Sequence, residues 1–194
     1  MKIGIVGWGV EGQSAYRYFG PDHEYLIVNE HQRDDFPPQA ATVKVQYLAG
    51  EKPVGVTGNV EDLSYLGGIE TCEKIIYTPT SLPNLKRVFG DDPAFWSKAT
   101  TDRHIFFETV KTKNIIGVTG TKGKGTTSTL IHHILEAAGK RVFLGGNIGK
   151  SVLDFVNEIQ PDDWAVLELS SFQLHWSDSV SPVASVCLNV AEDH

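Results

Sequence analysis

A short apolar run followed at once by a glycine-rich turn and a helical pattern occurs twice in this chain. The first run covers residues 3–6 and leads into Gly7-Trp8-Gly9-Val10-Glu11-Gly12. The second covers residues 114–118 and leads into Gly120-Thr121-Lys122-Gly123-Lys124-Gly125-Thr126-Thr127. A strand, a glycine turn and a helix N-terminus form a phosphate site, because backbone N–H groups are directed at the ligand there. Two such units predict two nucleotide-like ligands.

Other apolar runs alternate with helical patterns and predict an α/β fold with parallel sheets. These runs cover residues 25–28, 75–77, 142–144, 164–167 and 183–188, and helices are expected over 11–19 and 126–138. Residues 31–58 and 78–101 contain several prolines, and we expect them to be less regular. We place a domain boundary near residue 112, so that a Rossmann-like domain (1–112) precedes part of a P-loop NTPase-like ATP-binding domain (113–194).

Composition narrows the possible partners and compartment. The 194 residues carry a net charge of -7, which gives no reason to expect binding to nucleic acid or to an anionic membrane. Cys72 and Cys187, the two cysteines, lie far apart and favour a reducing compartment. Neither a signal peptide nor an apolar run of about 18 residues is present. We therefore expect a cytoplasmic protein.

The first loop alone leaves several ligands open. Glu30 ends the second apolar run, near the spacing at which a carboxylate meets a ribose hydroxyl in dinucleotide sites. A nicotinamide or flavin site, a site for another nucleotide and a purely structural turn all fit this pattern.

The second loop is more specific. Lys124 supplies the charge that can bridge the outer phosphates of ATP. Such loops usually have Ser or Thr directly after the lysine to bind magnesium, but Gly125 stands there, so we prefer Thr126 as the ligand. Glu168 ends an apolar strand and is a natural second magnesium ligand. Asp193 and His194 follow the last apolar run and could complete the same edge.

Several strings together resemble the ATP-dependent Mur ligases of peptidoglycan synthesis. They are residues 120–124, Gly146-Asn147-Ile148-Gly149 and Asn189-Val190-Ala191-Glu192-Asp193-His194. The string Glu168-Leu169-Ser170-Ser171-Phe172-Gln173-Leu174 and residues 4–15 are similar to the branch that adds D-glutamate to UDP-N-acetylmuramoyl-L-alanine. The resemblance spans essentially the whole chain.

The resemblance implies that the first loop grips a uridine diphosphate instead of NAD. It assigns the UDP-sugar to Val10, Glu11, Glu30, His31, Thr78 and Asn147, and ATP to Gly120, Thr121, Lys122, Gly123, Lys124, Gly125, Thr126 and Thr127. Mg²⁺ would be held by Thr126, Glu168 and His194, and the catalytic set would be Lys124, Glu168 and His194. In this family the substrate carboxylate attacks the γ-phosphate of ATP, and the amine of D-glutamate then displaces phosphate from the acyl phosphate. Ser170 and Ser171 are then structural or positioning residues.

Some features depart from the family pattern. Lys122 stands where the family more often has asparagine, and Gly125 makes the second loop similar to that of folylpolyglutamate synthases, so another ligase of this group stays possible. The family has three domains, and the resemblance therefore implies an N-terminal fragment, monomeric and inactive alone, without the amino-acid-binding domain and the downstream carbamylated lysine. An NAD-dependent oxidoreductase and a non-catalytic nucleotide-binding module are the alternatives from other classes. We interpret His132, His133 and His175 as surface or packing residues.

Overall fold

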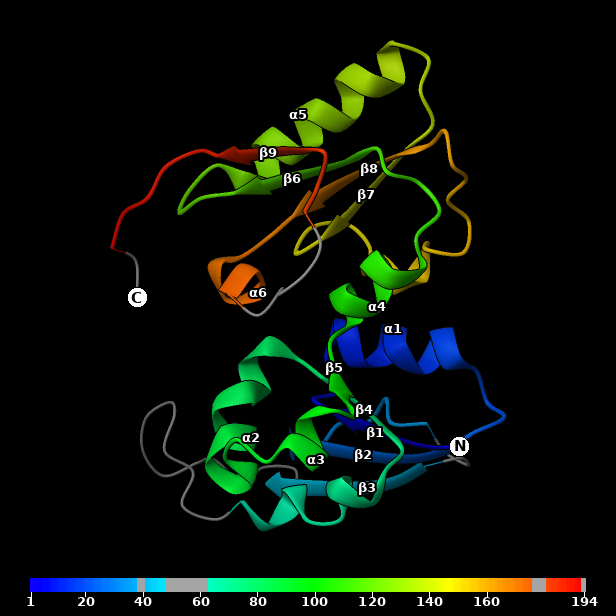
Figure 1. Ribbon diagram of the computed structural model, residues 1–194, viewed down its shortest axis with the longest axis vertical. Coiled ribbons are helices and arrows are strands. Elements are labelled where there is room, and N and C mark those ends of the chain that lie inside the picture. The colour runs from blue at the N-terminus through cyan, green and yellow to red at the C-terminus, as the bar shows by residue number, and fades with distance from the viewer. Residues whose placement is uncertain (38–40, 48–62, 176–180, 193–194) are drawn as a thin grey trace. The chain divides into compact units, whose positions relative to one another are not determined.

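The computed structural model describes residues 1–37, 41–47, 63–175 and 181–192. Its contacts divide the chain into two compact units, Met1–Asp102 and Arg103–His194 (Figure 1). The domain boundary near residue 112 stays a prediction. Each unit is built around its own parallel sheet, as the alternation of apolar runs and helical patterns predicts.

The first unit contains a five-stranded sheet in the order β3-β2-β1-β4-β5, and every pair in it is parallel. Its strands are β1 (Lys2–Val6), β2 (Glu24–His31), β3 (Ala41–Tyr47), β4 (Lys74–Tyr77) and β5 (Ala99–Thr100). This order is that of a Rossmann-type dinucleotide-binding sheet, which binds ligands outside the carboxyl ends of its strands. The Rossmann-like expectation is therefore confirmed.

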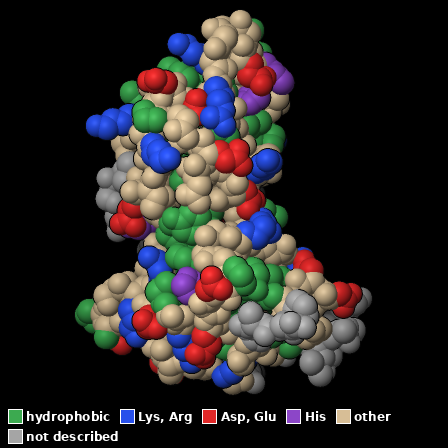
Figure 2. Space-filling view, turned by 90° about the vertical axis from the view of Figure 1, so that its right-hand side faces the viewer, with side chains coloured by type: hydrophobic (Ala, Val, Ile, Leu, Met, Phe, Trp, Pro, Cys, Tyr) green, Lys and Arg blue, Asp and Glu red, His purple; other side chains and the backbone are tan. Residues whose placement is uncertain are grey.

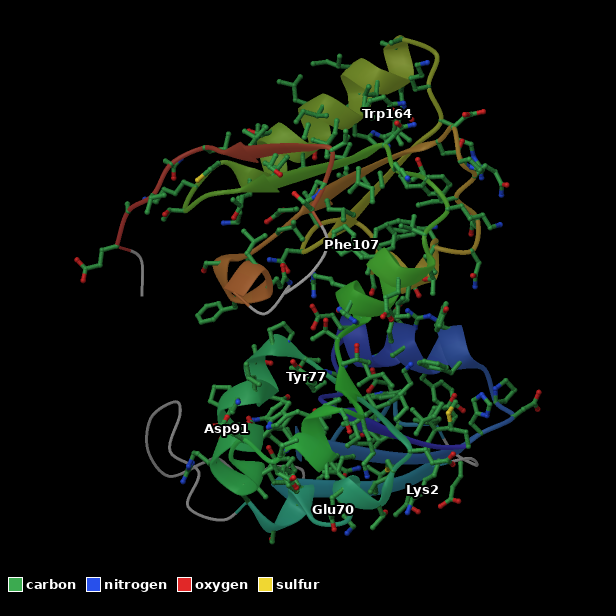
Figure 3. The ribbon with its side chains drawn as sticks, viewed as in Figure 1. Lys2, Glu70, Tyr77, Asp91, Phe107 and Trp164 are labelled. Atoms are coloured by element: carbon green, nitrogen blue, oxygen red, sulfur yellow. The ribbon has the colours of Figure 1, made fainter. Side chains whose placement is uncertain are left out.

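Both faces of this sheet are covered. On one face, Ile5 lies against Gly12 of helix α1 (Val10–Phe19). On the other face, side chains of β1, β2 and β4 pack with helices α2 (Leu82–Phe89) and α3 (Pro93–Trp96) and with the short helices η1 (Ser64–Leu66) and η2 (Ile69–Thr71); this core includes Val6, Val28, Tyr77, Leu66, Leu85 and Phe95. Figure 3 labels Tyr77 within this unit. Alternation of side chains along the strands supplies both apolar faces.

The expectation of irregular structure was wrong for part of two segments. Residues 78–101 contain η3 (Pro79–Ser81), α2, α3 and β5, and each of these three helices has a proline at its first or second position. A helix tolerates proline there, because the N–H that proline lacks has no partner inside the helix. Residues 31–58 include β3, where exposed Thr42 and Lys44 alternate with half-buried Val43 and Val45.

The second unit contains a four-stranded parallel sheet in the order β7-β8-β6-β9. Its strands are β6 (Ile115–Thr119), β7 (Val142–Gly146), β8 (Trp164–Glu168) and β9 (Ala184–Cys187). Helix α5 (Lys124–Ala137) covers one face (Figure 1). Phe155 packs on Phe143 of β7 and near Phe106 of helix α4 (Asp102–Thr109), beside the short helix η4 (Val152–Asp154). Helix α6 (Ser171–His175) follows β8.

Long apolar helices are absent from the part of the chain that the structure describes. None of the described helices has both the length and the apolar character required to cross a membrane.

Candidate nucleotide-binding sites

The three glycines of the first loop have different roles. Gly7 has φ +92°, and a Cβ atom there would also lie 2.6 Å from Thr78 Oγ1. A Cβ atom at Gly12 would lie 2.0 Å from the carbonyl oxygen of Gly7, so only glycine lets α1 approach β1 this closely. No heavy atom of the described residues lies within 4 Å of a Cβ at Gly9, which leaves the backbone open to a ligand. These are the three roles that glycines have in a dinucleotide-binding turn.

The loop leads into the N-terminus of α1, and no side chain caps that helix. Part of the loop is fixed by β2, because Asn29 Oδ1 accepts a hydrogen bond from the backbone N–H of Trp8 at 2.8 Å. The first N–H groups of the helix carry partial positive charge that favours an anion. The turn is therefore suited to a diphosphate.

The predicted UDP-sugar residues of the first unit lie at one edge of its sheet. Val10 and Glu11 begin α1, Glu30 and His31 end β2, and Thr78 directly follows β4. The register pairs Val6 with both Val28 and Tyr77, so the carboxyl ends of these three strands are adjacent. Val10 and His31 are exposed, Glu11 and Glu30 are half-buried, and Thr78 is buried. The edge thus combines a helix N-terminus with a carboxylate and a hydroxyl.

A buried residue beside Glu30 was missed in the sequence. Asn84 of α2 is 6% exposed, and its Nδ2 donates to Glu30 Oε1 at 3.0 Å and lies 3.4 Å from Tyr65 Oη. The first of these contacts holds one carboxylate oxygen of Glu30 in place. A polar residue in the short amphipathic run of α2 was the available signal, but its partner lies 54 residues away in sequence.

We expect Asn84→Ala to weaken the binding of a uridine diphosphate ligand about tenfold. A hydrogen bond to a charged group contributes roughly 1.5–3 kcal/mol, and part of that is lost when Glu30 is no longer oriented. Isothermal titration with the UDP-sugar measures the change, and Asn157→Ala, at an exposed asparagine of the second unit, is the control. ATP affinity should stay constant in both variants. Unchanged UDP-sugar affinity in folded Asn84→Ala would contradict a positioning role.

The second loop forms the turn that its sequence predicts. It connects β6 to α5, and Gly123 precedes the helix with φ +86° and no side-chain cap. Lys124 is half-buried, and its Nζ donates to the carbonyl oxygens of Gly120 at 2.8 Å and Thr121 at 3.1 Å. The ammonium group therefore lies over the loop, close to where phosphate oxygens would be cradled.

Glu168 is brought against this loop by the pairing of β8 with β6. The register places Val118 opposite Glu168, and a Cβ atom at position 125 would lie 3.4 Å from Glu168 Oε2. Glu168 is 8% exposed, yet its carboxylate makes no hydrogen bond or ion pair with any residue that the structure describes. A buried carboxylate without a partner is costly, which suits a site that a cation completes.

The structure gives less information on the other predicted metal ligands. Thr126 is exposed in the first turn of α5, and Thr127 is half-buried. Ser128, one position further, is buried and donates from Oγ to the carbonyl oxygen of Lys124 at 2.9 Å. Asp193 and His194 lie outside the described residues. The magnesium ligands Thr126, Glu168 and His194 therefore stay a prediction.

Asn147 lies in the turn after β7, at the carboxyl ends of the strands of the second sheet. Its N–H donates to the carbonyl oxygen of Glu168 at 3.1 Å, and its Oδ1 accepts from Gln173 Nε2 at 2.5 Å. Gln173 is buried and also accepts from the backbone N–H of Ser170 at 2.7 Å. Ser170 Oγ accepts from the backbone N–H of Gln173 at 3.3 Å. The contacts of Ser170 are those of a structural residue, and Gln173 fixes the amide of Asn147.

Asn189 braces the second loop, a role that its sequence position did not reveal. Its Oδ1 accepts from the N–H of Lys122 at 2.9 Å, and its Nδ2 donates to the carbonyl oxygen of Lys122 at 3.0 Å. Its own carbonyl oxygen accepts from the N–H of Thr121 at 3.0 Å. Two segments about 67 residues apart in sequence are thereby joined. The loop keeps its shape through these bonds as well as through its glycines.

We expect Asn189→Ala to lower ATP affinity roughly tenfold to thirtyfold, because two hydrogen bonds of about 1 kcal/mol each no longer hold the loop. Asn189→Asp keeps the acceptor for Lys122 N–H but places a charged oxygen against the carbonyl oxygen of Lys122, so ATP affinity should fall at least as far as in Asn189→Ala. Titration with ATP measures both, and UDP-sugar affinity is the internal control. Equal ATP affinity in Asn189→Ala and the unmodified protein would contradict the proposed role of Asn189 in holding the second loop.

The fold combines two parallel α/β sheets, each with a glycine turn that leads into a helix N-terminus, and comparison with known proteins adds to this description. Residues 118–194 match the family model described as Mur ligase middle domain. Relatives that are 29% and 31% identical align with 100% and 98% of the chain, so the similarity extends beyond the residues that match this family model.

Two curated relatives carry the name "UDP-N-acetylmuramoylalanine--D-glutamate ligase". The protein of Mycobacterium leprae is 54% identical over 78 residues, 40% of this chain and 16% of that protein. The protein of Hydrogenovibrio crunogenus is 31% identical over 192 residues, 98% of this chain and 40% of that protein. A solved UDP-N-acetylmuramate:L-alanyl-gamma-D-glutamyl-meso-diaminopimelate ligase of Neisseria meningitides is 16% identical with a TM-score of 0.48, covering 100% of this chain and 61% of that one. The chain spans about two fifths of the length of the relatives that match it throughout.

Proposed function

We propose that this chain provides the UDP-substrate site and part of the ATP site of a ligase that adds D-glutamate to UDP-N-acetylmuramoyl-L-alanine in peptidoglycan synthesis. One observation carries the proposal: Glu168, buried and without a partner among the described residues, faces position 125 of the phosphate loop. This combination serves phosphoryl transfer and has no role in an oxidoreductase. We further infer a cytoplasmic monomer, from composition and family resemblance.

The second loop would bind the phosphates of ATP. Its backbone N–H groups and the ammonium group of Lys124, now bonded to two loop carbonyls, supply the positive potential. Phosphoryl transfer needs positioning and charge stabilisation more than covalent help from the protein. No protein nucleophile is therefore required.

The donor set fits Mg²⁺. A hard cation prefers oxygen ligands, and the carboxylate of Glu168 is directed at the loop without a protein partner among the described residues. Glu168, Thr126 and His194 are the proposed ligands. When bound, Mg²⁺ neutralises charge that develops on the transferring phosphoryl group.

The first loop would hold the uridine diphosphate of the other substrate. The uncapped N-terminus of α1 faces the diphosphate, and Glu30, oriented by Asn84, accepts hydrogen bonds from the nucleoside. Asn147, oriented by Gln173, would donate from its amide to the sugar-peptide end. The terminal carboxylate of this substrate then attacks the γ-phosphate, ADP leaves, and the amine of D-glutamate displaces phosphate from the acyl phosphate to form the amide.

Two measurements test the proposal. On this chain, titration should give binding of UDP-N-acetylmuramoyl-L-alanine in preference to NAD, and separate binding of ATP. On the natural full-length protein, phosphate release should require ATP, the UDP-sugar and D-glutamate together. Release with a different amino acid would replace the substrate assignment and keep the ligase class. Tight NAD binding without phosphate release would favour the oxidoreductase, and binding without turnover would favour a non-catalytic module.

A further inference from the structure

Three metal-ligating side chains converge on helix α5, away from its phosphate-loop end. His132 Nδ1 lies 3.2 Å from Glu136 Oε2, and His133 Nδ1 lies 3.1 Å from the same oxygen. The three ligand atoms all lie within 4.8 Å of one another. In Figure 2, histidine and acidic side chains lie side by side on the surface at the height at which Figure 1 places α5.

Ordinary helix ion pairs explain this cluster only in part. Residues three and four apart are neighbours on a helix, so a histidine and a glutamate at these spacings often pair. His133 Nδ1 does form a hydrogen bond with Glu136 Oε2. His132 Nδ1 is buried, and despite its short distance from the same oxygen it forms no hydrogen bond with any described residue. One carboxylate oxygen therefore lies near both rings but forms a hydrogen bond with only one of them, and the other ring nitrogen is left unsatisfied.

A single cation would satisfy all three atoms. Zinc binds histidine nitrogen and carboxylate oxygen at about 2.0–2.2 Å, which places neighbouring ligands of a tetrahedral site roughly 3.4 Å apart. The observed separations of 3.1 and 3.2 Å are close to that edge. Two imidazoles and one carboxylate are borderline ligands that suit zinc, copper or nickel, whereas Mg²⁺ prefers oxygen ligands alone.

We propose that His132, His133 and Glu136 form a binding site for a zinc-class transition metal ion, separate from the site for Mg²⁺ and ATP. The side chains of His132, Glu136 and His133 are 17%, 49% and 67% exposed, so the ion can enter from solvent. All three ligands come from one helix, so binding requires no movement of other elements. The remaining coordination position would be taken by water.

The test is titration of the metal-free chain with Zn²⁺ at pH 7.5, where an ordinary histidine is neutral and able to bind metal. We expect one equivalent to bind tightly, and the double variant His132→Ala/His133→Ala to lose roughly 100-fold or more in affinity for that equivalent, since loss of an outer-shell partner alone costs 10–100-fold. Excess Mg²⁺ should not compete. With Co²⁺ as the probe, a tetrahedral site should give a d–d absorption that the double variant lacks.

The chain offers a matched control on another helix. His104 Nε2 lies 3.2 Å from Glu108 Oε1, a histidine and glutamate four apart without a second histidine. His104→Ala should leave zinc affinity unchanged. Zinc that binds to histidines other than those replaced binds equally to the unmodified chain and to the variants. The difference in zinc affinity between the unmodified chain and the double variant therefore reports on this site alone. Alanine favours helix, and far-ultraviolet circular dichroism will verify that α5 persists. The proposal is overturned if the double variant binds as tightly as the unmodified chain, or if neither binds.

Discussion

Lys124→Ala is expected to reduce ATP-dependent phosphate release by the full-length protein about 10²–10³-fold, the usual cost of removing a group that stabilises developing charge. The Lys124 ammonium is already positioned over the loop by the carbonyl oxygens of Gly120 and Thr121. Phosphate oxygens would take over these bonds, so the charge acts without reorganisation when the phosphoryl group transfers. A coupled assay for inorganic phosphate measures the loss, and titration measures the accompanying fall in ATP affinity.

The control for this prediction is Lys140→Ala. Lys140 is exposed in the segment that follows α5, and alanine preserves its backbone hydrogen bond to Leu135. Turnover and UDP-sugar affinity should both stay as in the unmodified protein. If Lys124→Ala retained full turnover, the proposed role of Lys124 in phosphoryl transfer would fail, because the backbone N–H groups of the loop would then be sufficient without its charge.

Glu168→Gln is expected to abolish most activity while making the protein more stable. Glutamine preserves the shape of the side chain but removes the charge, so phosphate release should fall by about 10² or more and lose its response to Mg²⁺. Glu168 is 8% exposed and its carboxylate has no partner among the described residues, so its neutralisation should raise the free energy of unfolding slightly. Thermal unfolding without ligand and the phosphate assay are the two measurements.

The opposite signs of these effects distinguish a ligand-binding role from a structural one. A carboxylate retained for the fold would lower both stability and activity when replaced, whereas a binding site commonly sacrifices stability for function. Glu158→Gln, at an exposed position of the same unit, should change neither quantity. A fall in the melting temperature of Glu168→Gln would count against the metal assignment.

Local sequence predicted the strands and the two glycine turns well. Apolar runs 3–6, 25–28 and 164–167 all lie within strands of the expected kind, because a strand buried on both faces must be apolar throughout. β3 was missed, since polar residues occupy its exposed positions on an edge strand. Helices α2 and α3 were missed because prolines, read as breakers, stand at their starts.

Some residues of the candidate sites also have a local sequence signal, and others do not. Gly7, Gly12, Lys124 and Glu168 could be singled out from sequence, because a phosphate turn and the carboxylate at a strand end have local signatures. Asn84 and Asn189 could not, since each acts through one partner 54 or 67 residues away. The supporting role of such a residue depends on which strands become neighbours.

By itself, the sequence determined that this protein has two glycine turns between strand and helix on parallel α/β units, because glycine and apolar spacing act over a few residues. Only the tertiary structure decided what surrounds each turn. The order β3-β2-β1-β4-β5 brings Glu30 beside Asn84, and the order β7-β8-β6-β9 places Glu168 and Asn189 on either side of the second loop. Strand order is set by long-range packing of side chains, and no local pattern contains it.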